Sequence, residues 1–598
     1  MTAAVPSTSS PILEAREVHK TFRRESGQEV RALDGVSLQV GQADLTALVG
    51  PDGAGKTTLI RLAAGLMTAD SGQVHVLGID AATDPQQVQS RIAYMPQRFG
   101  LYEDLTVQEN LDLYANLHGV TREQRREVYP RLMEMTALGP FTRRLAGRLS
   151  GGMKQKLGLA CTLVRTPELL LLDEPTVGVD PLSRRELWEI INQLVASGLT
   201  VVVSTSYLDE AERCEHVIVM HEGRVLAQGK PGEVTARAAG HTFLVRPAER
   251  QKARDVQDRL LDEPRVVDAV PEGGMVRVVL DGNRAEKEQG GDPLAGLAAE
   301  PTPSRFEDGF MVLLRQKTGA AARAVLASAP GQEPPAHLDP GDMAVEVHDL
   351  VRQFGSFTAV DHVSFQVRSG EIFGLLGPNG AGKTTTFRML CGLLPASGGT
   401  LQVAGVDVRH ARASARQRIG YVAQKFSLYG QLSVLDNLNF FASAYGLRQK
   451  RKAQRIDWAL QQFELGSFRH VPSGQLPGGY KQRLAMAAAL LHEPEILFLD
   501  EPTSGADPLA RREFWRRITA LARRQVTVIV TTHFMEEAEY CDRAVIMDSG
   551  RVLAQGTPAE IRRRGRAESG RQPNMEDAFI AIVEDARRSS HARGAGAA

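Results

Sequence analysis

One internal repeat limits what this chain can fold into. The segment GPDGAGKTT at 50–58 recurs as GPNGAGKTT at 377–385, so its start shifts by 327 residues, from 50 to 377. The same shift carries Asp173 to Asp500. A period this long indicates a duplicated domain, because solenoid repeats span only about 20 to 50 residues. The 598 residues also exceed what one hydrophobic core normally holds, so we expect two similar domains.

Each repeat contains the glycine-rich pattern GxxxxGK[ST], with an apolar segment before it and a helix-compatible segment after it. In this context the glycines let backbone N–H groups close around phosphate oxygens at a helix N-terminus. We expect Lys56 and Lys383 to reach the β- and γ-phosphates. A glycine turn that binds nothing is the alternative, and two intact copies at matched positions argue against it. The predicted ATP-binding residues are Gly50, Pro51, Asp52, Gly53, Ala54, Gly55, Lys56, Thr57 and Thr58, with Gly377, Pro378, Asn379, Gly380, Ala381, Gly382, Lys383, Thr384 and Thr385.

An apolar segment that ends in two acids follows each phosphate loop along the chain. The segments are LLLLDEP at 169–175 and ILFLDEP at 496–502. A buried strand delivers such carboxylates to the C-terminal edge of a sheet, beside the phosphate loop. A strand that ends in a solvated acidic turn is the alternative interpretation. We expect Mg²⁺ to be held by Thr57 and Asp173 in one repeat and by Thr384 and Asp500 in the other, and Glu174 and Glu501 to act as general bases.

A third motif is specific to one family. LSGGMKQKL at 149–157 and LPGGYKQRL at 476–484 resemble the signature sequence of ABC ATPases. The resemblance covers about residues 12–235 and 342–565. It implies an α/β fold with two P-loop NTPase domains of the ABC type, each with a mixed-sheet core, an antiparallel β subdomain and a helical signature subdomain. It also implies roles for Gln97 and Gln424 (glutamine loops, at ATP and Mg²⁺), Ser150, Gly151, Gly152, Gly478 and Gly479 (signatures), Asp180 and Asp507 (D-loops), His533 (catalytic switch histidine), and Phe22 and Phe354 (stacking on adenine).

The same resemblance implies that the domains dock head to tail, with each ATP between the phosphate loop of one and the signature of the other. Two differences between the repeats then fall in one site. At the 327-residue shift, Ser206 of the first repeat corresponds to His533 of the second, and Ser150 of the first corresponds to Pro477 of the second. Proline offers a phosphate neither N–H nor hydroxyl, and serine lacks the reach and proton exchange of imidazole. Drift without consequence is the alternative. We call the site with Lys56, Glu174, Ser206 and Pro477 site one, and the site with Lys383, Glu501, His533 and Ser150 site two, which we expect to be the main hydrolytic one.

The segment between the repeats differs from both. Residues 241–282 show a strand, a helix and two strands, the pattern of a small α+β appendage. Residues 283–341 are rich in Gly, Pro, Ala and charge, and predict a linker with a closing helix near 303–314. The remaining expected units are a disordered arm at 1–11, the first domain at 12–240, the second at 342–572, and a closing helix with a disordered tail at 573–598.

Composition narrows the function classes. The 71 Lys and Arg residues balance the 71 Asp and Glu residues, which argues against nucleic-acid binding. The four cysteines form no CxxC pair, so neither a zinc site nor a disulfide framework is expected. No apolar run reaches the roughly 20 residues of a membrane-spanning helix, so we expect membrane partners to supply the transmembrane part.

The overall layout resembles the YbhF-like tandem ATPases of bacterial ABC-2-type exporters. This resemblance implies ATP hydrolysis that drives efflux through two transmembrane permease subunits, at the cytoplasmic face of the inner membrane. Two alternatives stay open: a soluble ribosome-associated ATPase of the ABC-F type, and the tandem ATPase of a sugar importer. The first type normally has a long, charged, helical linker, and the second a degraded second phosphate loop, whereas the linker here is rich in Gly and Pro and Lys383 is intact.

Overall fold

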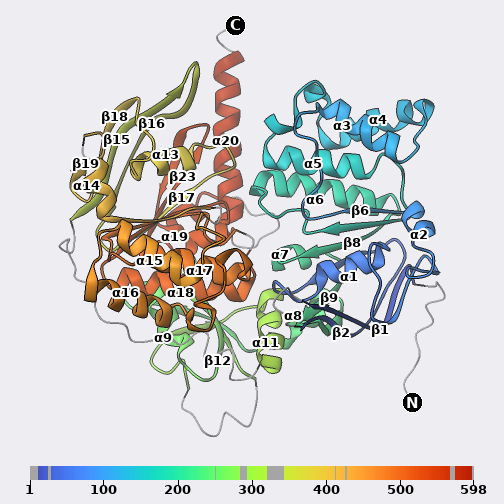
Figure 1. The fold of residues 1–598 in the computed structure, drawn as a ribbon, viewed down its shortest axis with the longest axis horizontal. Coiled ribbons are helices and arrows are strands. Elements are labelled where there is room, and N and C mark those ends of the chain that lie inside the picture. Colours follow the sequence, from blue (N-terminus) through green and yellow to red (C-terminus); the bar gives the residue numbers. More distant parts are fainter. Residues whose placement is uncertain are drawn as a thin grey trace.

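The computed structural model describes residues 11–23, 29–249, 251–282, 292–318, 342–410, 412–424, 427–504, 506–565 and 573–595. The repeats form two halves that lie side by side, with the green segment between them below both (Figure 1). Except for Pro11, the arm expected at 1–11 lies outside the described residues.

The first half combines a six-stranded mixed sheet with a four-stranded antiparallel sheet. The mixed sheet has the order β10 (Arg224–Gly229), β9 (His216–His221), β3 (Leu45–Val49), β8 (Thr200–Thr205), β7 (Leu169–Asp173) and β6 (Ile92–Met95). The antiparallel sheet has the order β2 (Glu29–Val40), β1 (Leu13–Arg23), β4 (Ser71–Val76) and β5 (Ile79–Asp80). Strands β3, β7 and β8 are buried along their whole length, as expected for parallel strands covered on both faces.

The second half repeats this arrangement. Its mixed sheet has the order β20 (Ile419–Val422), β21 (Ile496–Asp500), β22 (Thr527–Thr532), β17 (Ile372–Leu376), β23 (Arg543–Asp548) and β24 (Arg551–Gly556). Its antiparallel sheet has the order β16 (Phe357–Arg368), β15 (Met343–Phe354), β18 (Gly398–Val403) and β19 (Val406–Asp407). The register pairs Asp500 with Thr531, as it pairs Asp173 with Ser204 in the first half. Each acidic strand therefore ends beside a hydroxyl.

Most helices also correspond between the halves at the 327-residue shift, except that Leu208–Ala211 matches a 3-10 helix at Met535–Tyr540 and that Met575–Ala595 matches none of the described first-half helices. The first half has α1 (Lys56–Ala63), α2 (Pro85–Arg91), α3 (Val107–Leu117), α4 (Arg122–Thr136), α5 (Gly151–Thr162), α6 (Pro181–Ala196), α7 (Leu208–Ala211) and α8 (Pro231–Thr235). The second has α13 (Lys383–Leu390), α14 (Arg412–Gln417), α15 (Val434–Ala444), α16 (Gln449–Gln462), α17 (Gly478–Ala489), α18 (Pro508–Arg523), α19 (Pro558–Arg562) and α20 (Met575–Ala595). Asp180 and Asp507 cap α6 and α18, since their carboxylates accept from Ser183 N and Ala510 N.

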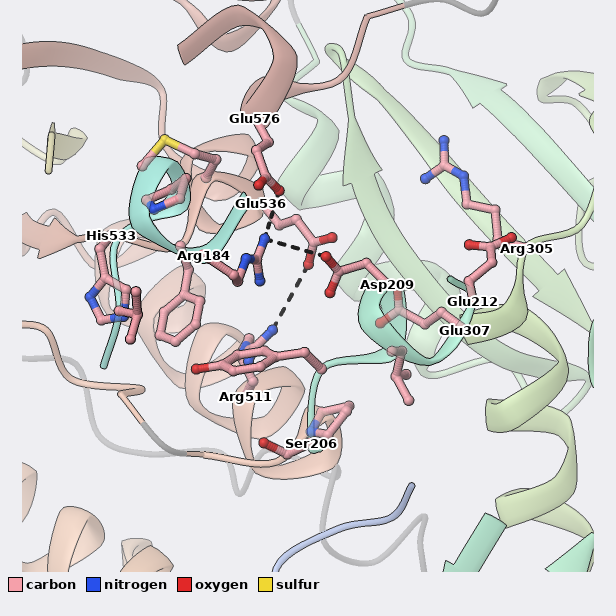
Figure 2. Close-up of a pocket in the computed structure, with 17 residues that line it drawn as sticks. Arg184, Ser206, Asp209, Glu212, Arg305, Glu307, Arg511, His533, Glu536 and Glu576 are labelled. Carbon is pink, nitrogen blue, oxygen red and sulfur yellow. Dashed lines mark hydrogen bonds and ion pairs between the residues drawn. The ribbon is translucent and has the colours of Figure 1, made fainter. Parts of the chain in front are cut away.

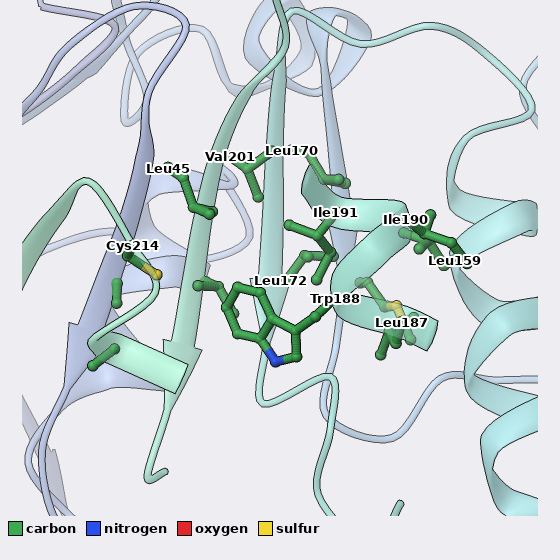
Figure 3. Packing of buried hydrophobic residues seen from close by; sticks show 14 of the residues in the cluster. Leu45, Leu159, Leu170, Leu172, Leu187, Trp188, Ile190, Ile191, Val201 and Cys214 are labelled. Carbon is green, nitrogen blue, oxygen red and sulfur yellow. The ribbon is translucent and has the colours of Figure 1, made fainter. Parts of the chain in front are cut away.

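The largest core cluster joins the mixed sheet of the first half to helix α6. Figure 3 shows Trp188 and Ile191 of α6 beside Leu170, Leu172 and Val201 of strands β7 and β8. The exposed fraction of all five is 1% or less. Burying a side chain of this size contributes about 1.5–3 kcal/mol. This packing fixes α6, and with it the loop that precedes α6, against the strand that carries the acids.

The segment between the repeats forms its own antiparallel sheet, which extends further than the sequence suggested. The sheet has the order β12 (Val266–Glu272), β13 (Met275–Leu280), β11 (Thr242–Arg246) and β14 (Ala298–Pro301), with helix α9 (Ala253–Leu261) against β12. Strand β14 lies in the expected linker, but its backbone pairs with β11 and so belongs to the appendage. Helix α20 likewise continues to Ala595, where we expected a disordered tail.

Helix α11 (Phe306–Thr318) joins the appendage to the first half. It packs against α8, and this close approach requires a glycine. A Cβ on Gly309 would lie 1.9 Å from the Val234 carbonyl oxygen. The appendage is thereby held on the half that precedes it, as the fold class with a small α+β insert implies. Both P-loop domains of that expected fold class are also present.

The opposite side of the appendage docks on the second half through ion pairs. Arg516 of α18 donates to Asp258 at 3.1 Å and also contacts Asp262. Arg523 donates to Asp255 at 2.9 Å. The Arg516 side chain is 5% exposed, so its charge is stabilised by these carboxylates and hardly by water. Helix α6 has Glu189 and Ala196 at the equivalent positions, so of the two halves only the second carries these arginines.

Replacing Arg516 with Ala should loosen this docking. The change leaves the Asp258 carboxylate buried with less charge compensation, and breaking a buried pair typically costs about 3–5 kcal/mol. We expect amide hydrogen exchange in α9 and β12 to accelerate by at least roughly a hundredfold in the full chain. Glu189→Ala on α6 is the matched control and should leave that exchange unchanged. Equal exchange in both variants would contradict the docking role of Arg516.

Candidate nucleotide sites

Both phosphate loops depend on glycines in the left-handed region. Gly55 and Gly382 precede α1 and α13 with φ of 101° and 96°. A Cβ on Gly55 would lie 2.5 Å from the Ala32 carbonyl oxygen, and one on Gly382 would lie 2.6 Å from that of Ala359. A side chain at either position would therefore push the loop away from the neighbouring β subdomain.

The two loop lysines are buried and bond to their own loops. Lys56 Nζ donates to the Gly50 carbonyl oxygen at 2.6 Å, and Lys383 Nζ donates to that of Gly377 at 2.7 Å. Burial lowers the pKa of Lys383, because its charge has little solvation there. An anion in the loop would supply the missing compensation. The loops thus present a positive charge and backbone donors to a phosphate.

The candidate general bases occupy strained positions at the ends of β7 and β21. Glu174 and Glu501 have φ of 49° and 47°, which costs a residue other than glycine about 1–3 kcal/mol. The Glu174 N–H donates to the Ser204 carbonyl oxygen at 3.1 Å. Gln97 and Gln424 donate their side-chain amides to Glu174 and Glu501, each at 2.6 Å. Both halves therefore hold the carboxylate in the same direction, toward the phosphate loop.

The oxygen atoms around Asp173 suit a magnesium ion. The hydroxyls of Thr57 and Ser204 donate to Asp173 Oδ1 at 3.0 and 2.6 Å. Oδ2 is buried with no hydrogen-bond partner among the described residues. Mg²⁺ usually takes one or two carboxylates and keeps several waters, so one aspartate with a threonine and a glutamine oxygen fits it. No group of three His, Cys, Asp or Glu in the described ranges could form a site of protein ligands alone.

Among the described residues, an imidazole lies near the candidate base in the second half only. His533 Nδ1 lies 3.3 Å from Glu501 Oε2, and the ring is 3% exposed. Burial acts to raise the pKa of Glu501, but His533, Lys383 and Gln424 outweigh it, so the pKa is lowered. Glu501 is therefore held ionised, as a base must be. Ser206 is buried at the corresponding position in the first half.

The halves meet head to tail at these loops. The Asn379 side-chain amide of the second phosphate loop donates to the Gly178 carbonyl oxygen of the first half at 3.3 Å. A Cβ on the signature residue Gly151 would lie 3.4 Å from the same amide. In the reverse direction, the Asp52 N–H donates to the Asp507 carboxylate at 3.3 Å. Each phosphate loop thus contacts the loop that precedes α6 or α18 in the other half.

The two signatures begin differently. The Ser150 hydroxyl accepts from Met153 N at 3.2 Å and caps α5. Pro477 begins α17 without a side-chain cap. Among the described residues, a Cβ on Gly478 or Gly479 would meet no atom within 4 Å. The first signature is therefore packed against the opposite half, whereas the corresponding glycines of the second contact no described residue of the other half this closely.

The aromatic residues expected at adenine are exposed. Phe22 and Phe354 lie at the ends of β1 and β15, with 39% and 46% of their surfaces exposed. The Lys20 ammonium lies 5.8 Å from the Phe22 ring centroid, and the Arg352 guanidinium lies 4.4 Å from that of Phe354. A free ring face beside a cation suits a purine whose phosphates are negative.

A charged pocket between the halves was not apparent from the motifs. It is lined by Ser206 and His533 together with an ion-pair cluster (Figure 2). Arg184 of α6 donates to Glu576 of α20 at 2.6 Å and lies 3.3 Å from Asp209. Helix α20 of the second half is thereby tied to α6 of the first half.

The repeat itself carried a signal for this cluster. At the 327-residue shift, Arg184 and Asp209 correspond to Arg511 and Glu536, which lie 3.9 Å apart across the same pocket. Matched charges in two repeats, outside any known motif, were thus a sign of a shared interface.

The phosphate loops, acidic strands and signatures together define an ABC-type ATPase with two nucleotide-binding domains on one chain. A family model described as "ABC transporter" matches residues 33–177 and 360–504. The "Probable multidrug ABC transporter ATP-binding protein YbhF" of Escherichia coli (strain K12) is 48% identical over 566 residues, covering 94% of this chain and 96% of that protein. The "Nod factor export ATP-binding protein I" of Ralstonia nicotianae is 42% identical over 218 residues, covering 36% of this chain and 68% of that protein.

The chain therefore belongs to the ABC transporter family, as an ATP-binding subunit that hydrolyses ATP. Within the described residues, none of the helices is both long enough and apolar enough to span a membrane.

Lys383→Ala should remove ATP from one of the two sites. Loss of a buried charged hydrogen bond costs about 1.5–3 kcal/mol, so we expect affinity at that site to fall roughly 10- to 150-fold. Equilibrium binding of a non-hydrolysable ATP analogue should then show one tight site per chain. Lys56→Ala should do the same at the other loop, and the double variant should retain neither. Two tight sites in either single variant would exclude that loop as an ATP site.

Proposed function

We propose that this chain is the ATP-hydrolysing subunit of a multi-subunit exporter, which drives efflux through two separate transmembrane permease subunits of the ABC-2 type. The proposal is supported chiefly by the 48% identity, over nearly the full length of both chains, to a protein named as a multidrug transporter ATP-binding protein. The name of the Nod factor export relatives points the same way. Such a subunit would act at the cytoplasmic face of the bacterial inner membrane, as a peripheral protein.

Two exposed tyrosines support a permease-binding surface. Tyr102 and Tyr429 follow the glutamine loops, with 57% and 50% of their surfaces exposed. A buried asparagine holds the backbone of each tyrosine in place. Asn110 accepts from Tyr102 N at 3.0 Å and donates to its carbonyl oxygen at 3.1 Å, and Asn437 binds Tyr429 in the same way. A rigid aromatic side chain suits a protein interface, since little conformational entropy is lost on binding.

For hydrolysis, we propose that Glu501 accepts a proton from the attacking water while Lys383 and the loop N–H groups bind the phosphates. His533 would orient that water and the γ-phosphate, because its ring already lies beside Glu501. When bound, Mg²⁺ would neutralise phosphate charge. Thr384 and Asp500 would hold it in site two, with the oxygen of Gln424, and Thr57, Asp173 and Gln97 would hold it in site one.

We further propose that site two performs most of the turnover. Site one has Ser206 in place of the switch histidine, and its signature begins at the uncapped Pro477. Site two keeps His533 and the capped Ser150. Catalysis of phosphoryl transfer rests on positioning, so a missing contact at each end of the γ-phosphate should slow site one strongly.

Glu501→Gln should reduce ATPase activity far more than Glu174→Gln. Loss of a general base typically lowers the rate about 10²- to 10⁴-fold, so steady-state phosphate release should almost stop in the first variant. The second should retain most activity. Adding Pro477→Ser and Ser206→His to the Glu501→Gln chain should raise its residual rate. Equal losses of ATPase activity in Glu501→Gln and Glu174→Gln would contradict the proposed division of labour.

The transporter assignment is tested by affinity purification of the full chain from detergent-solubilised native membranes. We expect two multi-span proteins to co-purify. The Tyr102→Ala/Tyr429→Ala variant should lose them while binding ATP normally, because neither tyrosine is one of the residues proposed to bind ATP. Recovery of ribosomal proteins instead would favour the ABC-F alternative, and recovery of permeases with a periplasmic binding protein would favour the importer.

A further inference from the structure

The phosphate loops differ at one position that the motif does not specify. The first reads GPDGAGKTT and the second GPNGAGKTT, so Asp52 stands where the second repeat has Asn379. Both residues lie at the contact between the halves. The change replaces a side chain that can donate hydrogen bonds with one that, when ionised, can only accept them.

In site two this position joins the halves. The Asn379 amide donates to the Gly178 carbonyl oxygen in the loop that leads to Asp180. The signature residue Gly151 packs against the same amide, since a Cβ there would lie 3.4 Å away. Asn379 therefore contacts two elements that must close over the γ-phosphate.

In site one the same position faces like charge. The loop opposite Asp52 carries Asp507, whose Oδ2 accepts from the Asp52 N–H at 3.3 Å. Asp507 cannot turn away freely, because its other oxygen caps α18 through Ala510 N at 2.9 Å. The Asp52 side chain is exposed, and the Asp507 charge acts to raise its pKa, with Lys56 acting to lower it and Glu174 to raise it further. An ionised Asp52 is thus disfavoured when the loops meet.

We propose that Asp52 is a positioning residue that opposes closure of site one over ATP, while Asn379 favours closure of site two. The carboxylate repels Asp507 of the opposite half and would also repel the γ-phosphate carried by its own loop. Bound ATP in site one would then stay loosely enclosed. This inference rests on the proposed division of labour between the sites and supplies a cause for it in addition to Ser206 and Pro477.

The test measures ATP that stays trapped in the chain. In the Glu174→Gln/Glu501→Gln background, which blocks hydrolysis at both sites, radiolabelled Mg·ATP is bound at pH 7.5 and free nucleotide is removed by rapid gel filtration. We expect about one occluded ATP per chain, rising toward about two with Asp52→Asn added and falling with Asn379→Asp added. Asp52→Glu is the matched control, because it keeps the charge and should stay near one.

A pH profile separates this role from a general effect on folding. Because the Asp507 charge acts to raise the pKa of Asp52 above its ordinary value when the loops meet, closure of site one is fully favoured at acid pH, where Asp52 is protonated, and loses that advantage as the pH rises and Asp52 ionises. Occlusion in the background chain should therefore rise between pH 7.5 and 5.5, and Asp52→Asn should remove that slope.

The outcomes distinguish this inference from the proposed function. Unequal ATPase losses in the single glutamine variants, together with unchanged occlusion in Asp52→Asn, would overturn the role of Asp52 and leave the division of labour standing. Equal ATPase losses, together with occlusion that rises in Asp52→Asn and no longer depends on pH there, would overturn the division of labour instead. Equal gains in Asp52→Asn and Asp52→Glu would show that charge is not the cause.

Discussion

The rest of the structure depends on the contact between the phosphate loop of one half and the D-loop of the other. In the arrangement that we propose, neither half holds a complete site, because Lys383 and Glu501 come from the second half and Ser150 comes from the first. The contact between Asn379 and the Gly178 carbonyl oxygen brings these groups together. Whatever fixes the relative position of the halves therefore fixes the geometry in which a phosphate would be attacked.

Two sets of ion pairs set the relative position of the halves. One links an element of the second half to the first half, and the other links the appendage that follows the first half to the second half. Helix α20 of the second half is tied to α6 of the first half by Arg184 and Glu576, and the appendage after the first half is tied to α18 of the second by Arg516. Helices α6 and α18 both begin at the aspartates that end the D-loops. These ion pairs thus hold helices α6 and α18, whose N-termini lie beside the phosphate loops of the opposite halves. Such links raise the effective concentration of each half for the other, which favours contact between the phosphate loop of one half and the D-loop of the other.

The sequence was sufficient for the parts whose chemistry is local. The phosphate loops and acidic strands could be predicted because a short segment contains all the glycines, lysines or acids that each needs. Strand β14 could not, since its four residues carry no alternating pattern and gain their partner only from β11. The appendage docking was equally hidden, because Arg516 on a helix surface normally indicates a solvated face. The ion-pair cluster around Arg184 required comparison of the repeats together with the knowledge that they face each other.

A single chain also explains how the sites can differ. Two identical subunits must form two identical sites, because every change appears in both. In a fused pair, each half changes alone. Asp52 and Ser206 lie in the first half and Pro477 lies in the second, and the proposed head-to-tail arrangement assigns all three to site one. Under the proposed division of labour, such changes can accumulate in one composite site while the other keeps its hydrolytic groups. The covalent link would then allow one ATP to be held loosely while the other is turned over.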